Sequence, residues 1–200
     1  MRVAQIMTKN PIHITPDKRV GQALKLIQKH NIRHLPVMKE GQMVGWITSR
    51  DLREVLLASM LEKITVADVM VKDPVKVSPD TSVEEAARLI HENKIGGMPV
   101  MEGERLVGVI TMLDLISAFL TMLSLLRSSS RLDVLLEDKP EVLEEVTRLI
   151  KGAGGKVINV ALGPAKGGKQ AYYFRLNKCD LAPIVAALKK QGHQVVDFIP

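Results

Sequence analysis

Apolar side chains recur every three to four residues in two stretches of the chain, a spacing that predicts helices with one buried face. The positions are Val20, Ala23, Leu24 and Ile27 in one stretch and Val83, Ala86, Ala87 and Ile90 in the other. Each predicted helix is followed by two short apolar runs of strand type, joined by a tight turn, and then by a second helix. The segment before the later stretch, residues 75–77, alternates as a short strand does, and Thr81 with Glu84 has the spacing of a capping box with Thr81 as N-cap.

These two stretches belong to copies of one sequence. Residues 3–53 align with residues 66–116 without a gap, and the phrase GWITSRD at 45–51 returns as GVITMLD at 108–114. Turn residues, apolar positions and polar positions recur together, which is typical of a structural repeat. A unit of this size is marginally stable alone, so we expect the two copies to bury a shared face against each other.

The repeated unit resembles the CBS domain, and the tandem resembles the CBS pair known as a Bateman module. The motifs that carry the resemblance are a proline before the first strand, a hydrophobic-Pro-Val run in the second, and Gly-hydrophobic-hydrophobic-Thr-x-x-Asp at the end of the third. The resemblance implies that the two units pack pseudo-symmetrically. It also implies that adenosine nucleotides (AMP, ADP or ATP) or related ligands can occupy clefts between them.

The Thr-x-x-Asp phrases pair Thr48 with Asp51 and Thr111 with Asp114, each at a predicted junction between strand and helix. Free backbone N–H groups at a helix N-terminus favour an anion, and a carboxylate accepts the two hydrogen bonds that ribose hydroxyls offer. The resemblance implies that these residues contact the nucleotide. Each pair also fits a simple capping box, and that alternative stays open.

Next to these phrases the two copies differ. The first copy has Arg33 and His34 before its Leu-Pro-Val run, and the second has Gly96 and Gly97 in these places. The resemblance implies that cations here reach phosphates, so we expect the phosphate-bearing ligand in the first-copy cleft. Solvated surface for the arginines, a half-buried hydrogen-bonded histidine and a tight turn at the glycines are the alternatives. The candidate nucleotide-binding residues are Arg33, His34, Pro36, Thr48, Arg50, Asp51, Gly97, Met98, Pro99, Thr111 and Asp114.

The last third of the chain has a different pattern. After a polar linker at residues 126–131, the elements predicted are strand, helix, strand, strand, helix and strand, which is the order of a ferredoxin-like plait. This order resembles the ACT domain, whose members pair side by side and bind amino acids between them. Glu141 stands where amino-acid-binding members have glycine, which argues against that ligand. The predicted class is therefore α/β and α+β, with CBS domains at 1–62 and 63–126 and an ACT-like domain at 131–200.

Residues 163–169 fit the phosphate-loop pattern G-x-x-x-x-G-K, but Gln170 follows where Ser or Thr would hold magnesium. A strand-like run comes next, so we interpret the segment as a hairpin turn. Catalytic triads, metal-ligand clusters and a working phosphate loop are not recognisable, so we expect no enzyme.

Charge and composition restrict the partners. The net charge is +6, but acidic residues are interspersed and only one Trp, two Tyr and three Phe are present, so we expect no nucleic-acid partner. The most apolar run, residues 115–126, is too short to span a bilayer. The single cysteine indicates a reducing compartment, and we expect a cytoplasmic protein.

The whole arrangement resembles acetoin-utilisation proteins of the AcuB type, most closely at residues 32–37 and 187–196. This resemblance implies a regulator of acetoin and acetate metabolism that acts on a metabolic enzyme. The rival interpretation is an architectural oligomerisation module with empty clefts. We also predict a homodimer in which the CBS pairs form a flat disc and the ACT-like units pair across the two-fold axis. The uncovered sheet edge, and the strand that places Tyr172, Phe174 and Leu176 on one face, are the expected association surface of these units.

Overall fold

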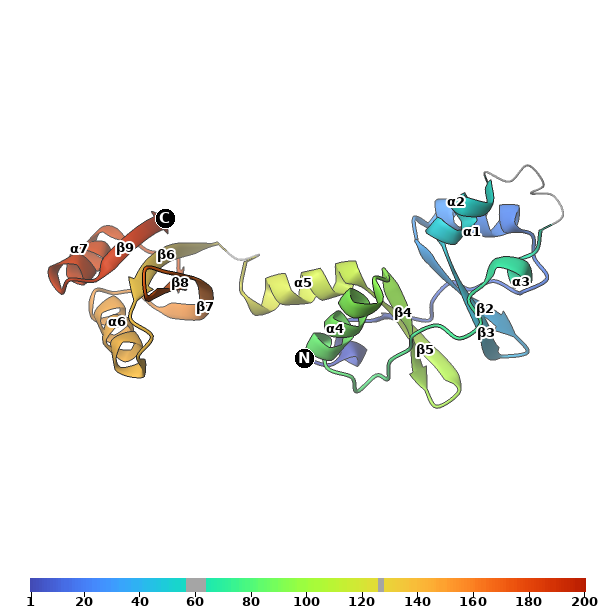
Figure 1. The fold of residues 1–200 in the computed structure, drawn as a ribbon, viewed down its shortest axis with the longest axis horizontal. Helices are drawn as coiled ribbons and strands as arrows, with labels where there is room; N and C mark the ends of the chain where they lie inside the picture. The colour runs from blue at the N-terminus through green and yellow to red at the C-terminus, as the bar shows by residue number, and fades with distance from the viewer. Residues whose placement is uncertain (57–63, 126–127) are drawn as a thin grey trace. The chain divides into compact units, whose positions relative to one another are not determined.

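The computed structural model describes residues 1–56, 64–125 and 128–200, and divides them into two compact units. The N-terminal unit is Met1–Ala118 and the C-terminal unit is Phe119–Pro200 (Figure 1). The boundary between the units follows the end of the second aligned copy at residue 116 and precedes the predicted linker at residues 126–131. Both sequence copies therefore belong to the N-terminal unit. The predicted boundary between the copies, at residues 62 and 63, lies outside the described residues.

Both copies fold in the same order of helix, two-stranded hairpin and helix. The first contains α1 Val20–His30, β2 His34–Lys39, β3 Gln42–Thr48 and α2 Ser49–Leu56. The second contains α4 Val83–Asn93, β4 Gly97–Glu102, β5 Arg105–Thr111 and α5 Met112–Met122. The predicted apolar stripes are confirmed, because Val20, Ala23, Ile27 and their counterparts Val83, Ala86 and Ile90 are all buried.

The segment that precedes each copy packs on the other copy. The short elements η1 Val3–Gln5 and β1 Thr8–Lys9 lie on the second copy, where Thr8 pairs with Val109 of β5. In the same way α3 Val66–Val69 leads to Val71, which bridges to Trp46 of β3 in the first copy. The two copies therefore exchange their leading segments, and each completes the core of the other.

This exchange explains the glycine in the repeated phrase. A Cβ atom on Gly108 would lie 2.6 Å from Sδ of Met7 and 2.9 Å from the Thr8 carbonyl oxygen. A Cβ atom on Gly45 would collide with Met70 in the same manner. Since the exchanged segment lies directly on each strand, only a residue without a side chain fits there.

Two local predictions for the second copy are wrong. The N-cap of α4 is Ser82, whose Oγ accepts a hydrogen bond from the Glu85 N–H at 3.1 Å. Thr81 instead accepts from the backbone N–H of Ser78, because two adjacent hydroxyl residues offer alternative caps one position apart. In the predicted strand at residues 75–77, pairing is limited to an isolated bridge between Val77 and Val100.

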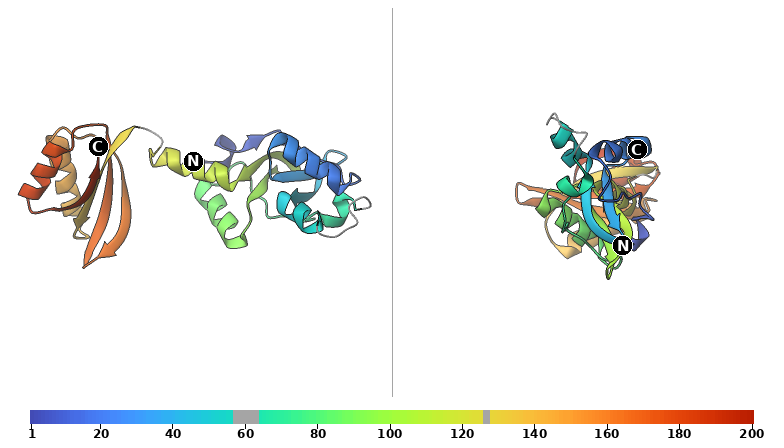
Figure 2. Two further views of the ribbon diagram at one scale, coloured as in Figure 1. Left: turned by 90° about the horizontal axis from the view of Figure 1, so that it is seen from above. Right: turned by 90° about the vertical axis from the view of Figure 1, so that its right-hand side faces the viewer.

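The C-terminal unit has the predicted βαββαβ order, with the elements β6 Ser129–Leu136, α6 Pro140–Gly152, β7 Val157–Lys166, β8 Lys169–Asn177, α7 Ala182–Lys190 and β9 Gln194–Ile199. The strands form one antiparallel sheet in the order β7-β8-β6-β9. Figure 2 shows both helices on the same face of this sheet. The predicted hairpin turn is confirmed, since β7 and β8 pair around Gly167 and Gly168, which have φ of 60° and 75°.

Two predictions about this unit need correction. The strand that carries Tyr172, Phe174 and Leu176 is β8, an interior strand, and these side chains are buried beneath the helices. They are core residues and do not form an association surface. The predicted linker is also shorter than expected, because Ser129 and the two residues after it belong to β6, while residues 126 and 127 lie outside the described part of the chain.

Candidate functional site

The two Thr-x-x-Asp phrases adopt the same geometry where β3 meets α2 and where β5 meets α5. In the first copy the Thr48 N–H and hydroxyl both donate to Oδ2 of Asp51 at 2.8 Å. In the second copy the Thr111 N–H and hydroxyl donate to Oδ2 of Asp114 at 2.8 and 2.6 Å. Oδ1 of each aspartate accepts no hydrogen bond among the described residues, so each phrase leaves one carboxylate oxygen for a further donor.

A third Thr-x-x-Asp pair makes the same hydrogen bonds at the protein surface, where they only cap a helix. Thr65 and Asp68, at the start of α3, make the same two bonds at 2.9 and 2.6 Å. These bonds lower the pKa of Asp68, which is exposed at the surface. The hydrogen bonds are therefore those of a helix cap, and the surroundings of Asp51 and Asp114, which are half-buried, distinguish them as candidate ligand contacts.

His34 links the two phrases. In the first copy it pairs across the hairpin with Thr48, and its ring stacks on Trp46 with 5.6 Å between centroids. The other side of the ring lies against the second copy at Gly96 and Gly97. Burial lowers the pKa of His34, the Arg33 charge lowers it further, and the carboxylates of Asp51 and Asp114 act in the opposite direction.

Positions 96 and 97 require glycine because the His34 ring occupies the space that a side chain would need. A Cβ atom on Gly96 would lie 3.0 Å from Nε2 of His34, and one on Gly97 would lie 3.1 Å from Cε1. Gly97 is also confined by the carbonyl oxygen of Ile110, 2.9 Å from the same position. Of the two interpretations of these glycines, close approach is therefore correct, and the approaching group is the histidine.

The two predicted arginines differ in their relation to this centre: the Arg33 charge acts on the His34 ring, and Arg50 is engaged elsewhere. Arg33 is exposed, and its carbonyl oxygen accepts from the N–H of Ser49 at 2.8 Å at the start of α2. Arg50 forms an ion pair with Glu54 one turn later on the same helix, at 3.2 Å, with both side chains well exposed. The structure brings together His34 and the two phrases, and it directs Arg50 along the surface.

The remaining predicted residues are strand positions. Pro36 and Pro99 are buried, and their carbonyl oxygens accept from the N–H groups of Ile14 and Val77 at 3.0 and 3.2 Å. Met98 is fully buried in the core. Two neighbours of the site, Trp46 and Gly96, were not among the predicted residues, although the chain's single tryptophan in a repeated phrase was a readable signal.

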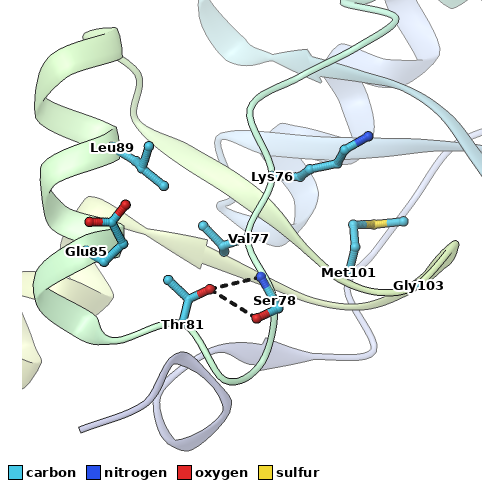
Figure 3. A pocket seen from close by; sticks show the side chains of 8 residues that line it. All are labelled: Lys76, Val77, Ser78, Thr81, Glu85, Leu89, Met101 and Gly103. Atoms are coloured by element: carbon cyan, nitrogen blue, oxygen red, sulfur yellow. Dashed lines mark hydrogen bonds between the residues drawn. The ribbon is translucent and has the colours of Figure 1, made fainter.

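Figure 3 shows a separate open hollow near the β4–β5 turn, with a volume of about 360 Å³. The residues that line it include Lys76, Glu85 and Met101. Glu85 is already engaged by Arg88, and Lys76 lies 3.4 Å from Asp73. None of the predicted nucleotide-binding residues lines this hollow, and we give it no role.

Within the described ranges, no cluster of three or more His, Cys, Asp and Glu residues is placed to hold a metal ion. The helices of those ranges are all too short or too polar to cross a membrane.

Comparison with known proteins identifies the repeat. The CBS domain family model matches residues 3–58 and 66–121. A CBS domain-containing protein of Dictyostelium discoideum is 33% identical over 134 residues, which is 60% of this chain and 92% of that protein. Inosine-5'-monophosphate dehydrogenase of Methanocaldococcus jannaschii is 35% identical over 114 residues, 56% of this chain and 22% of the enzyme. The chain thus spans less than a quarter of the dehydrogenases that it matches.

Solved structures agree. The CBS pair of protein MJ0100, in complex with 5'-methylthioadenosine and S-adenosyl-L-methionine, has a TM-score of 0.56 and 32% identity over 60% of this chain and 95% of that one. CBSX2 in complex with AMP has a TM-score of 0.54 and 28% identity over 60% and 96%. A putative acetoin utilization protein (AcuB) from Vibrio cholerae has a TM-score of 0.57 and 28% identity over 63% and 95%. With both copies matched by the family model and folded as a pair, this chain belongs to the CBS domain family.

Proposed function

We propose that the protein is a regulatory sensor that binds an adenosine-containing nucleotide (AMP, ADP or ATP) between its two CBS copies and is not itself a catalyst. The observation that carries this proposal is the pair of half-buried aspartates whose charges both act on one imidazole, that of His34. Oδ1 of each aspartate accepts no hydrogen bond from the described part of the chain. A cap needs only Oδ2, as Asp68 shows, so the free oxygens are available to a ligand.

The chemistry follows from these groups. Oδ1 of Asp51 or Asp114 accepts a hydrogen bond from a ribose hydroxyl, a charge-assisted bond that is stronger than a neutral one. The positive ends of the α2 and α5 helix dipoles favour an anion near these phrases, although the N–H groups of Ser49 and Met112 already donate to the carbonyl oxygens of Arg33 and Gly96. His34, when protonated, and Arg33 supply positive charge for phosphate. The adenosine ligands named for MJ0100 and CBSX2 support this ligand class.

Calorimetric titration with AMP, ADP, ATP and adenosine tests this proposal. Asp51→Ala and Asp114→Ala should each weaken one site by about 1–3 kcal/mol, the range for a hydrogen bond to a charged group. Asp68→Ala is the matched control, because it removes the same cap bonds at a surface position and should leave the affinities unchanged. If no nucleotide binds to the wild-type chain, the architectural alternative with empty clefts replaces this proposal.

We also propose that the C-terminal unit is ACT-like, that it joins two copies of the chain, and that it binds a second ligand. Support comes from the sheet edges. The β9 edge exposes Val196, Phe198 and Ile199, with relative exposures of 59, 48 and 50%. The opposite edge, β7, is interrupted by Pro164 and two register shifts, which protect an edge against pairing.

Light scattering tests this assembly. We expect a dimer at micromolar concentration, and a shift to monomer in Val196→Lys, which places a charge on the free edge. Leu162→Lys on β7, where the side chain is 69% exposed, is the matched control and should leave the dimer intact. A monomeric wild-type chain would exclude this route of association.

A role in acetoin and acetate metabolism, exercised on a metabolic enzyme, is the downstream part of the proposal. It rests on the similarity to AcuB of Vibrio cholerae. Capture of a partner enzyme by the nucleotide-loaded chain, and its release by the ligand-free chain, is the expected result. Equal capture in both states would contradict regulation by the clefts.

A further inference from the structure

Position 34 and its counterpart 97 cannot both carry a large side chain. The two positions are equivalent in the repeat, yet the His34 ring already lies within 3.1–3.3 Å of where a Cβ atom of Gly97 would be. A second ring would need the volume that the first one fills. The pair can therefore hold one imidazole at this point, and the second copy contributes only backbone.

That imidazole is adjacent to both Thr-x-x-Asp phrases. His34 stands directly opposite Thr48 in the β2–β3 hairpin. Gly97, which the ring contacts, stands directly opposite Thr111 in the β4–β5 hairpin. Each threonine begins the phrase that ends in a candidate ribose-binding aspartate. The register of two different hairpins thus puts one ring beside both clefts.

From this arrangement we infer that the His34 ring binds the phosphate of a nucleotide in either cleft, including the second-copy cleft. The two clefts therefore share this one histidine. The inference rests on the proposed nucleotide binding and changes one part of the sequence-based expectation, in which the first cleft alone had the cationic residues. Because one imidazolium cannot be fully engaged by two phosphates, filling one cleft weakens phosphate binding in the other.

The charges around the ring support a cation that forms on binding. The groups that act on it are Arg33, which directly precedes β2, Asp51 at the start of α2 and Asp114 at the start of α5. Trp46 and the glycine backbone lie against the ring and are uncharged. Burial and Arg33 hold the pKa of His34 below its usual value in the free protein. A phosphate brought next to the ring adds negative charge and favours the protonated form.

The decisive measurement is the preference for AMP over adenosine in each cleft separately. Asp114→Ala weakens the second cleft, so that binding to the first cleft is measured. Asp51→Ala weakens the first cleft, so that binding to the second is measured. Adding His34→Gln should reduce the AMP preference about tenfold in both proteins while leaving adenosine affinity unchanged, since a charge-assisted bond to phosphate is lost. His91→Ala, which changes an exposed histidine at the end of α4, is the control and should alter neither ligand.

The outcomes separate the two proposals. Loss of the AMP preference in both single-cleft proteins supports sharing. Sharing is also supported if the second AMP to bind the wild-type chain has a lower affinity than the same cleft shows in its single-cleft variant. Loss in the Asp114→Ala protein only, or two independent AMP sites in the wild type, overturns sharing but leaves nucleotide binding intact. Absence of binding by AMP and adenosine alike overturns both.

A second measurement needs no ligand. Titration of the His34 ring by NMR should give a lower pKa in Asp51→Asn and in Asp114→Asn than in the wild type, because each substitution removes a carboxylate that favours the protonated ring. Asp68→Asn, which changes the surface cap at α3, should leave the value unchanged. A ring that responds to Asp51 alone would show that it serves one cleft.

Discussion

Gly108→Ala tests the exchange of leading segments between the copies. The added Cβ would lie 2.6 Å from the Met7 sulfur and 2.9 Å from the Thr8 carbonyl oxygen. The thioether is flexible and yields, but the carbonyl belongs to β1, which is hydrogen-bonded to β5. Overpacking of this kind destabilises by about 1–3 kcal/mol. A smaller entropic gain from removing glycine, about 0.4–1 kcal/mol, offsets part of it.

Gly21→Ala is the matched control. Gly21 lies in α1 of the same unit, and a Cβ atom there would meet nothing within 4 Å. Gly21 is the second residue of α1, and replacing glycine by alanine at an unstrained position stabilises a protein by about 0.4–1 kcal/mol through the unfolded chain, so this variant should be more stable than the wild type. The two substitutions add the same methyl group and should act in opposite directions.

Guanidinium unfolding followed by tryptophan fluorescence is the assay. Trp46 is the single tryptophan of the chain and is 4% exposed in the N-terminal unit, so its signal reports that unit without interference from the other. With a slope of about 4 kcal/mol/M, a loss of 2 kcal/mol lowers the midpoint by about 0.5 M. If Gly108→Ala is as stable as Gly21→Ala, β1 does not pack on β5 and the exchange is refuted.

Two further predictions concern stability in each unit. Ser130→Ala should destabilise the C-terminal unit by about 1–3 kcal/mol, because the fully buried Ser130 hydroxyl donates to the Cys179 carbonyl and accepts from the Cys179 N–H, both at 3.1 Å. Circular dichroism during urea unfolding measures this loss, and Ser128→Ala, at an exposed position, should be neutral. The hydrogen bonds from Thr65 lower the pKa of Asp68, so its contribution to stability is present above about pH 4 and is lost as the pH falls. Asp68→Asn should therefore flatten the acid limb of the Trp46 unfolding midpoint against pH, and an unchanged limb would contradict the cap.

Much of the fold was predictable because its information is local and doubled. The helix stripes from Val20 and Val83 needed only a periodicity of three to four residues, and the aligned copies confirmed each other. The βαββαβ order of the last third was equally local. The misplaced N-cap at Thr81 is an ambiguity of one position, since Ser82 has the same chemistry and the choice depends on the path of the chain before the helix.

Non-local contacts were the limit of the sequence interpretation. Nothing in the run that contains Tyr172 tells that β8 has a neighbour on each side, because strand order is set by pairing between distant segments. The exchange that places Met7 on Gly108 is of the same kind. The Thr48 and Asp51 pair was recognised, but its cap bonds were not distinguishable from those of Thr65 and Asp68 without knowledge of burial.

The positions at which the two copies agree and those at which they differ have different physical causes. Gly45 and Gly108 are identical because each lies against an equivalent exchanged methionine, Met70 and Met7 respectively, and two separate places can be filled equally. His34 and Gly97 differ because their side chains would meet at one place, which only one of them can fill. An internal repeat therefore loses its symmetry where two equivalent side chains would need the same volume. In this chain that position lies beside both ribose-binding candidates, so the residue that cannot be duplicated is also the one placed to make the two clefts depend on each other.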